Sequence, residues 1–255
     1  MSAPACILIT GASGAIGGAL AREYAAPGVR LILQGRNRAV LDTLAADCAA
    51  CGAQPSIVCL DLRDVGGLRR WAGQIVQETL PDLVIANAGM NVDIGPGGAG
   101  ERWEYSEAVL EVNVRAVMAL VEAVLPALRA RRNGQIALMS SLAAYFGLPV
   151  TPSYCASKAA VKAYGEALRG WLGPEGIRVN VVMPGYIDSP MSRAMPGPKP
   201  FLWTPERAAR VIRRGLEKNR ARIAFPFPLH LGSWFLAVLP AEVSTRIVRR
   251  LGYRG

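Results

Sequence analysis

Ala5-Cys-Ile-Leu-Ile-Thr-Gly-Ala-Ser-Gly-Ala-Ile-Gly-Gly18 is the stretch that decides the fold of this chain. Its first half, residues 5–9, is a short continuous apolar run, which is typical of a strand buried on both faces. A glycine-rich turn follows and leads into a helical stretch over residues 19–26. Strand, glycine turn and helix together can cradle a phosphate, because glycines let the backbone approach an anion and the helix N-terminus offers free N–H groups.

The same alternation continues along the chain. Apolar runs predict strands over residues 29–34, 56–60, 82–86, 136–139 and 177–183, and helical spacing predicts helices over 39–50, 68–79, 105–131, 154–172 and 204–218. Strands alternating with helices at roughly thirty-residue intervals indicate βαβ units and a parallel sheet. We therefore expect an α/β fold, a Rossmann-type doubly wound parallel sheet.

A single domain is expected, because no linker or internal repeat divides residues 1–255. Its core would span residues 1–187, a substrate lid about 188–203, and a basic, apolar C-terminal extension about 204–255. Hydrophobic residues make up 51% of the chain, which suits a large core.

Composition argues against several classes of protein. Five cysteines without framework spacing and a single histidine, His230, favour a reduced, cytoplasmic setting without a metal site. No secretion signal is expected, because the strand pattern already begins at Cys6. The formal net charge is +10, but residues 205–255 alone hold eleven Lys and Arg against three Asp and Glu. A nucleic-acid binder would more often be basic across a whole face, so no nucleic-acid partner is expected.

Tyr154 and Lys158 are four residues apart and would share one helical face. A phenol titrates near ~10, and a neighbouring ammonium favours its ionised form. Ser141 ends the strand before this helix, so its hydroxyl could orient a carbonyl. Because ligands of doubly wound sheets bind at the carboxyl ends of strands, these residues are expected near the glycine turn.

Together these pieces resemble the classical short-chain dehydrogenase/reductase family. The matching segments are T-G-A-S-G-A-I-G at 10–17, D-L at 61–62, N-A-G at 87–89, N at 113, S at 141, Y-C-A-S-K at 154–158 and P-G-Y-I-D-S at 184–189. One departure is Ala15, which stands where the family usually has its middle glycine, with a glycine displaced to position 14.

The resemblance implies a nicotinamide cofactor. The residues it assigns are Gly11, Ser13, Ile16 and Gly17 to the pyrophosphate, Asp61 and Leu62 to the adenine, Asn87, Ala88 and Gly89 to the adenosine ribose, and Pro184, Gly185, Ile187 and Ser189 to the nicotinamide. NAD enzymes generally place an acidic residue at the end of the second strand, where this chain has Gly35 followed by Arg36. A guanidinium suits a 2′-phosphate, so NADP(H) is favoured over NAD(H). The alternative is that Arg36 is only a solvated residue before the next helix.

The resemblance also implies catalytic roles. Tyr154 would act as general acid or base, Ser141 would hydrogen-bond the carbonyl, and Lys158 would lower the Tyr154 pKa and hold the nicotinamide ribose. Asn113 would kink its helix and hold a water in a proton relay to Lys158; a packed or exposed amide is the alternative. Ser140 is the alternative to Ser141 as the serine that hydrogen-bonds the carbonyl.

The residues that determine substrate specificity are expected after Gly185. The segment 188–201 contains Met191 and Met195 and would form a mobile lid, since methionines adapt to varied apolar shapes. An apolar run over 225–240 is followed by basic residues. Packing or subunit contact in a homo-dimer or homo-tetramer, membrane-surface association through 225–250, and a cover for a lipophilic substrate all remain open.

The function expected is an NADP(H)-dependent oxidoreductase that interconverts a carbonyl and a secondary alcohol of a small, lipophilic molecule. One alternative is a sugar-nucleotide-modifying relative, although such relatives usually have longer chains and a different glycine loop. Another is a non-catalytic NADP-binding regulator or scaffold, against which the intact Ser141, Tyr154 and Lys158 argue. The protein would be cytoplasmic, with peripheral membrane attachment left open.

Overall fold

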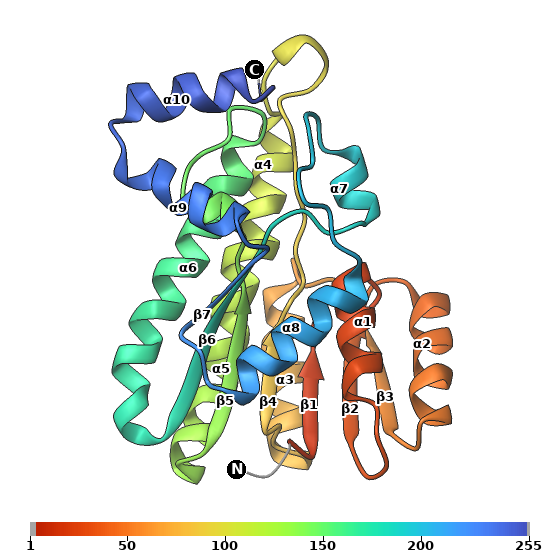
Figure 1. Cartoon of the computed structure of the whole chain (residues 1–255). Helices are drawn as coiled ribbons and strands as arrows, with labels where there is room; N and C mark the ends of the chain where they lie inside the picture. Colours follow the sequence, from red (N-terminus) through yellow and green to blue (C-terminus); the bar gives the residue numbers. More distant parts are fainter. Residues whose placement is uncertain (1–3, 254–255) are drawn as a thin grey trace.

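A seven-stranded parallel sheet lies at the centre of the computed structural model, which describes residues 4–253. Its strand order is β3-β2-β1-β4-β5-β6-β7 (Figure 1). The strands are β1 (Cys6–Ile9), β2 (Arg30–Gly35), β3 (Gln54–Cys59), β4 (Leu83–Ala86), β5 (Gly134–Met139), β6 (Ile177–Pro184) and β7 (Arg222–Phe225). The α/β doubly wound expectation is confirmed, and the strand order reverses between β1 and β4, where such sheets bind ligands.

Helices cover both faces of the sheet. The α-helices are α1 (Ala15–Tyr24), α2 (Arg38–Ala50), α3 (Val65–Glu78), α4 (Trp103–Leu110), α5 (Ala116–Arg131), α6 (Pro152–Leu172), α7 (Pro190–Ala194), α8 (Pro205–Glu217), α9 (Leu229–Val238) and α10 (Ala241–Arg250). Short 3₁₀ turns occupy Pro96–Gly98, Leu142–Ala144 and Gly173–Glu175. Among residues 4–253, no helix combines the length and the apolar character needed to cross a bilayer.

Alternation along the strands builds two cores. In β1, Ile7 and Ile9 point to the face covered by α1, α2 and α8, while Cys6 and Leu8 point to the face covered by α3, α5 and α6. All four residues are buried. A strand that is apolar at every position therefore reports burial on both sides, as the sequence predicted.

The long helix expected over residues 105–131 is interrupted. It consists of α4, a π-helical turn at Glu111–Arg115, and α5. The wider turn changes the direction in which its side chains and carbonyls point, and such turns are frequent at functional sites. Asn113 lies in the middle of this turn.

The sheet and its helices continue beyond residue 187, where the core was expected to end. β7 pairs with β6, from Val181 opposite Arg222 to Pro184 opposite Phe225, and α8 packs against α1. Residues 205–225 therefore belong to the sheet domain, and only α9 and α10 form the C-terminal extension. β7 was not predicted from the sequence, because its apolar part is three residues long and is bounded by an arginine and a proline.

The segment after β6 returns to its own starting point. Ile187 forms a β-bridge with Trp203, the Trp203 N–H donates to the Tyr186 carbonyl at 3.0 Å, and the Asp188 N–H donates to the Trp203 carbonyl at 2.9 Å. The two ends of the expected lid therefore lie side by side at the bridge between Ile187 and Trp203, which we call the closed neck. Between these ends the lid contains α7, and after Trp203 the chain continues into α8.

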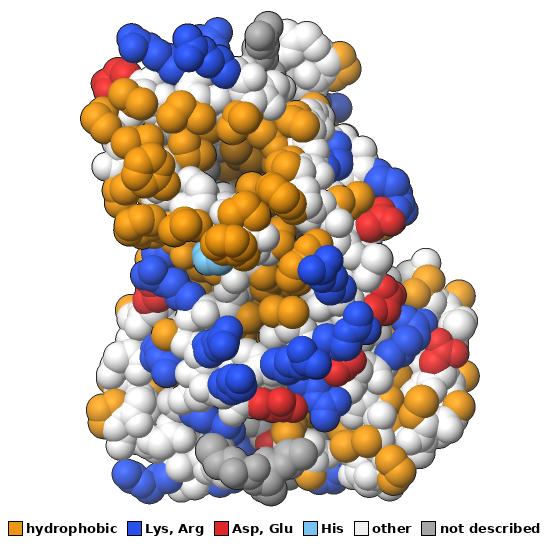
Figure 2. All heavy atoms as spheres, viewed as in Figure 1, with side chains coloured by type: hydrophobic (Ala, Val, Ile, Leu, Met, Phe, Trp, Pro, Cys, Tyr) orange, Lys and Arg blue, Asp and Glu red, His pale blue; other side chains and the backbone are white. Residues whose placement is uncertain are grey.

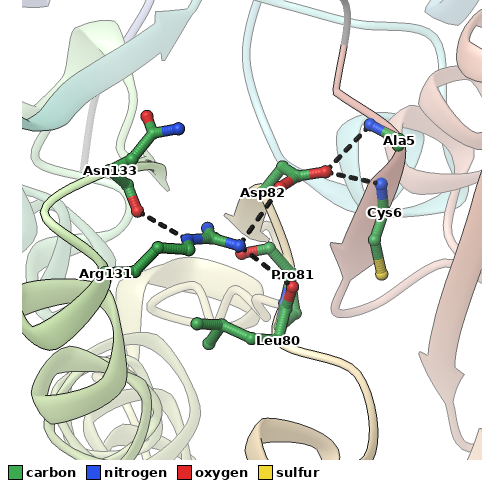
Figure 3. Close-up of polar contacts among 7 residues, drawn as sticks. All are labelled: Ala5, Cys6, Leu80, Pro81, Asp82, Arg131 and Asn133. Atoms are coloured by element: carbon green, nitrogen blue, oxygen red, sulfur yellow. Dashed lines mark hydrogen bonds and ion pairs between the residues drawn. The ribbon is translucent and has the colours of Figure 1, made fainter.

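A polar cluster ties the sheet together at the end away from the strands' carboxyl termini (Figure 3). The Asp82 carboxylate accepts hydrogen bonds from the backbone N–H groups of Ala5 and Cys6, both at 2.9 Å. Arg131 pairs with Asp82 at 3.2 Å and donates to the Pro81 carbonyl at 2.8 Å. Arg131 at the end of α5 thus connects the beginnings of β1 and β4.

Candidate active site

A cavity of about 700 Å³ crosses the carboxyl ends of the strands. It extends from the glycine turn between β1 and α1 to the C-terminal helices. The predicted site residues that line it are Gly11, Ser13, Ile16, Arg36, Asp61, Leu62, Asn87, Ala88, Gly89, Ser141, Tyr154, Lys158, Pro184, Gly185, Ile187 and Ser189. Gly17 and Asn113 do not line it, and both act from behind its wall.

The glycine turn leaves space and free donors for an anion. Gly11 has a φ of +65°, a conformation that favours glycine. A Cβ at Gly17 would lie 2.3 Å from the Gly11 carbonyl oxygen, so Gly17 lets α1 start against the turn. The α1 N-cap, Gly14, makes no side-chain hydrogen bond, and the first turn of α1 has no acidic residue. These features fit a phosphate group.

A side chain at the end of β2 would have to displace the side chain of Ser13. A Cβ at Gly35 would lie 2.7 Å from Ser13 Oγ. Arg36 is exposed and lines the cavity, so its guanidinium is the group available there. The Asp61 carboxylate pairs with Arg63 at 2.7 Å, and hydrogen bonds from Arg63 hold the Asp61 pKa below its usual value. Its contact with an adenine stays a prediction.

Two residues that sequence reasoning missed hold this half of the cavity in shape. Thr10 Oγ1 accepts hydrogen bonds from the N–H groups of Asn87 at 3.0 Å and Ala88 at 3.1 Å. Gln34 Oε1 accepts from the Gly11 N–H at 3.0 Å, and its Nε2 donates to the Leu60 carbonyl at 2.6 Å. Polar residues placed directly after apolar strand runs were the available signal.

Tyr154 and Ser141 lie together on the cavity wall. Burial raises the Tyr154 pKa to about 12, and a hydrogen bond with Ser141 partly offsets this rise. Ser140, the competing serine, donates its hydroxyl to the Lys158 carbonyl at 2.7 Å and is buried. Of the two serines, Ser141 is therefore the one beside the phenol.

Lys158 is placed differently from the sequence expectation. Its Nζ donates to the Met139 carbonyl at 2.9 Å and lies 5.6 Å from the centroid of the Tyr154 ring. Burial lowers the Lys158 pKa to about 8. Burial is the largest influence on both pKa values, and the expected lowering of the Tyr154 pKa by Lys158 stays a prediction.

Asn113 is a fully buried amide that joins two elements behind the cavity. Its Oδ1 accepts from the Met90 N–H at 2.9 Å, and its Nδ2 donates to the Met90 carbonyl and to Ser157 Oγ, both at 2.9 Å. Ser157 in turn donates to the Tyr154 carbonyl at 2.7 Å. Asn113 thus links the loop after β4 to α6, and its part in a water relay stays a prediction.

The far half of the cavity is built by the lid and the C-terminal helices. The lining residues that the sequence did not identify include Tyr186, Leu229, Ser233, Leu236, Val248, Leu251 and Tyr253. The Tyr186 and Tyr253 hydroxyls are 2.5 Å apart, and the Tyr253 hydroxyl donates to the Pro198 carbonyl at 2.6 Å. Lys199 Nζ donates to the Met195 carbonyl at 2.7 Å.

The position of α9 and α10 bears on the three interpretations of the tail. Leu229, Ser233 and Leu236 lie on the side of α9 that faces the cavity. The C-terminal segment therefore forms one wall of the cavity, as a substrate cover would. Its outward side remains exposed at Trp234 and Phe235, which leaves a second role for the same helix.

Comparisons with known proteins agree with this arrangement. The family model described as short chain dehydrogenase matches residues 5–198. An uncharacterized oxidoreductase of Myxococcus xanthus is 32% identical over 247 residues, which are 96% of this chain and 96% of that protein. Dehydrogenase/reductase SDR family member 7B of Bos taurus is 35% identical over 200 residues, which cover 74% of this chain and 59% of that protein.

Solved structures share the fold. A short-chain dehydrogenase from Sphingobium yanoikuyae in complex with NADPH has a TM-score of 0.80 at 24% identity, covering 96% of this chain and 95% of its own. An alcohol dehydrogenase from Comamonas testosteroni, described as bulky-bulky ketone specific, has a TM-score of 0.78 at 21% identity, covering 98% and 92%.

Proposed function

Because this chain belongs to the short chain dehydrogenase family, we propose that it is an NADP(H)-dependent oxidoreductase that interconverts a carbonyl compound and a secondary alcohol. One observation carries the proposal: the glycine turn, Ser141, Tyr154 and Lys158 line a single cavity. The first can bind a dinucleotide pyrophosphate, and the other three supply a proton and orient a carbonyl oxygen.

The residues along the cavity fit a nicotinamide dinucleotide. The turn at Gly11 and the N-terminus of α1 would hold the pyrophosphate, and Pro184 and Gly185 would contact the nicotinamide ring. When bound, the dinucleotide supplies or accepts the hydride. Arg36 would pair with a 2′-phosphate, and Gly35 stands where an NAD enzyme generally has an acidic side chain.

Tyr154 would move the proton. With its pKa raised to about 12, the phenol is protonated at neutral pH and can donate to a carbonyl oxygen during reduction. Ser141 would donate a hydrogen bond to the same oxygen. Lys158, whose pKa is lowered to about 8, carries its charge at pH 7 and would stabilise the phenolate that remains.

The substrate would be a small lipophilic carbonyl or alcohol. The cavity wall beyond Tyr154 is mainly apolar, with Leu229, Leu236 and Met195 among its residues. We also expect a homo-dimer or homo-tetramer, as the family resemblance implies, in a cytoplasmic setting, as the cysteine content suggests.

Oxidation of NADPH against a panel of ketones and aldehydes tests the proposal. Tyr154→Phe should lower kcat about a hundredfold or more, because general acid catalysis contributes on the order of 10²–10⁴. Tyr164→Phe is the matched control, since Tyr164 is on the same helix but does not line the cavity. NADPH binding without turnover of any carbonyl would instead favour the NADP-binding regulator, and full activity in Tyr154→Phe would exclude the proposed acid.

Cofactor preference has its own test at Arg36. Arg36→Ala should raise KM for NADPH by roughly tenfold or more while leaving KM for NADH unchanged, since a charge-assisted pair is lost only with the phosphorylated cofactor. Arg38→Ala is the control, because Arg38 is exposed and pairs with Asp42 within α2. If the ratio of the two constants does not change in Arg36→Ala, Arg36 does not select the cofactor.

A further inference from the structure

Helix α9 is apolar on two opposite sides. Its inner side, with Leu229 and Leu236, lines the cavity. Its outer side carries Leu231, Trp234, Phe235 and Val238, which follow helical spacing and are all exposed, Phe235 by 51% and Val238 by 57%. A helix without a polar face is normally buried on all sides, so the outer side of α9 lacks the covering that its composition calls for.

The exposed apolar surface continues around the mouth of the cavity. Phe227, just before α9, is 73% exposed. Leu251, after α10, and Met191, in α7, are 59% and 41% exposed and also line the cavity. Figure 2 shows hydrophobic side chains gathered around a hollow in the upper half of the molecule, where Figure 1 places α9. We call Phe227, Leu231, Trp234, Phe235, Val238 and Leu251 the apolar rim.

Positive charge borders the apolar rim. The α9 sequence contains no Asp, Glu, Lys or Arg. The following helix, α10, carries Arg246, Arg249 and Arg250, whose spacing places them on one side of the helix, and all three are exposed. None of the three forms an ion pair within residues 4–253. Apolar side chains beside unpaired arginines are the combination by which helices lie in a lipid interface.

We propose that the apolar rim and the arginines of α10 dock the protein on the surface of an anionic lipid bilayer, with the cavity opening toward the lipid. The charge decides between this partner and a second copy of the chain. A two-fold interface places the same patch of both copies together, and here it would bring two sets of unpaired arginines to one interface. Anionic headgroups would instead pair with them.

The docked orientation would give a lipid-dissolved substrate direct entry to Tyr154. This part rests on the proposed oxidoreductase function, whereas the docking itself does not. A carbonyl compound that partitions into the bilayer could enter the cavity past Leu251 without crossing water, and this would explain an apolar mouth on a cavity that also binds a charged cofactor.

Vesicle flotation of the full chain tests the docking. Vesicles of phosphatidylcholine mixed with phosphatidylglycerol should carry the protein upward, and vesicles of phosphatidylcholine alone should carry less of it. Added salt should weaken the binding, because it screens the arginines. Trp234 fluorescence should shift to the blue on binding, and this shift should disappear in Trp234→Phe. Absence of flotation on the anionic vesicles would overturn the proposal.

Paired substitutions separate the apolar rim from surface hydrophobicity in general. Trp234→Ser with Phe235→Ser should reduce the bound fraction about tenfold or more, because both side chains lie on the outer side of α9 and neither lines the cavity. Trp103→Ser with Tyr105→Ser, two exposed aromatics on α4, should leave binding unchanged. Equal effects of the two pairs would contradict the assignment of the rim.

Charge is tested by a matched pair of triple variants. Arg246→Gln, Arg249→Gln and Arg250→Gln should each contribute to weaker binding, on the order of fivefold per arginine near an anionic surface. Neutralising Arg38, Arg69 and Arg70 on α2 and α3 removes the same charge from elements outside the rim and should have little effect.

Turnover and assembly separate the remaining outcomes. The variant with Trp234→Ser and Phe235→Ser should reduce a water-soluble carbonyl compound at the wild-type rate. It should reduce a bilayer-dissolved carbonyl compound more slowly than the wild type does. Vesicle binding without turnover of either substrate would refute the proposed function and leave the docking intact. A dimer in light scattering that Trp234→Ser with Phe235→Ser converts to monomer would show that a second copy covers the rim, and would overturn the proposal.

Discussion

At the scale of single residues, burial controls the ionisable groups of the site. Burial moves the pKa values of Tyr154 and Lys158 apart, up to about 12 for the phenol and down to about 8 for the ammonium. Sequence spacing correctly indicated that the two side chains share a face of α6. It could not indicate the burial of either group, because that depends on the lid and on β5.

The Lys158 pKa predicts how stability depends on pH. The folded protein binds the Lys158 proton less tightly than the unfolded chain, whose lysine titrates near 10.5, so its burial cost is relieved as pH rises. Between pH 8 and pH 10 the free energy of unfolding should therefore rise by about 2 kcal/mol relative to Lys158→Met. Urea titrations of both proteins at several pH values measure this, and parallel curves would show that Lys158 is not held in this way.

At the scale of elements, the π-helical turn connects the fold to the candidate active site. It interrupts the α4–α5 helix at Asn113 and sets this amide between Met90 and Ser157. An asparagine inside a helix was the visible signal, and the family resemblance implied a kink there; the structure has a π-helical turn at this position. The partners on the loop after β4 and on α6 are distant in sequence and had no local signal.

Removing this amide should destabilise the protein. Asn113→Ala leaves the Met90 N–H and carbonyl, which are half-buried, without these partners, so the free energy of unfolding should fall by about 1–3 kcal/mol. Asn133→Ala is the control, because Asn133 is exposed and its contact with Arg131 uses the main-chain carbonyl. Similar losses in both variants, measured by urea unfolding, would contradict a special role of the buried amide.

Some helices and strands were easier to predict from the sequence than others. β1 and β5 are apolar runs buried on both faces, so pattern alone identified them. β7 was missed, because Ile223 and Phe225 stand in a segment otherwise rich in arginine and proline. The two sides of α9 could not be separated by periodicity, because both are apolar, and only the folded structure shows which side lines the cavity.

At the scale of the whole molecule, the two ends of the sheet have separate tasks. The carboxyl ends of the strands carry the cavity, while the opposite end is tied by Asp82 and Arg131. None of the residues in that polar cluster lines the cavity (Figure 3). The contacts that stabilise one end of the sheet are therefore separate from the residues that line the cavity at the other end.

This separation predicts a variant that loses stability and keeps its kinetics. Arg131→Met removes the bonds to Asp82 and to three backbone carbonyls, and should lower the free energy of unfolding by about 2 kcal/mol. Its kcat/KM should equal that of the wild type. Arg38→Met, which breaks an exposed pair, should cost less than about 1 kcal/mol. A fall in kcat/KM for Arg131→Met would show that the two ends are coupled.

The closed neck at Ile187 and Trp203 has a consequence for how this scaffold can diversify. A loop whose two ends meet in a β-bridge is an Ω-loop, and its length and sequence can vary without shifting the strands that it leaves and rejoins. The part of this segment after Ser189 can thus be exchanged between relatives. Insertion, deletion or grafting there can change one wall of the cavity while Ser141, Tyr154 and Lys158 keep their positions.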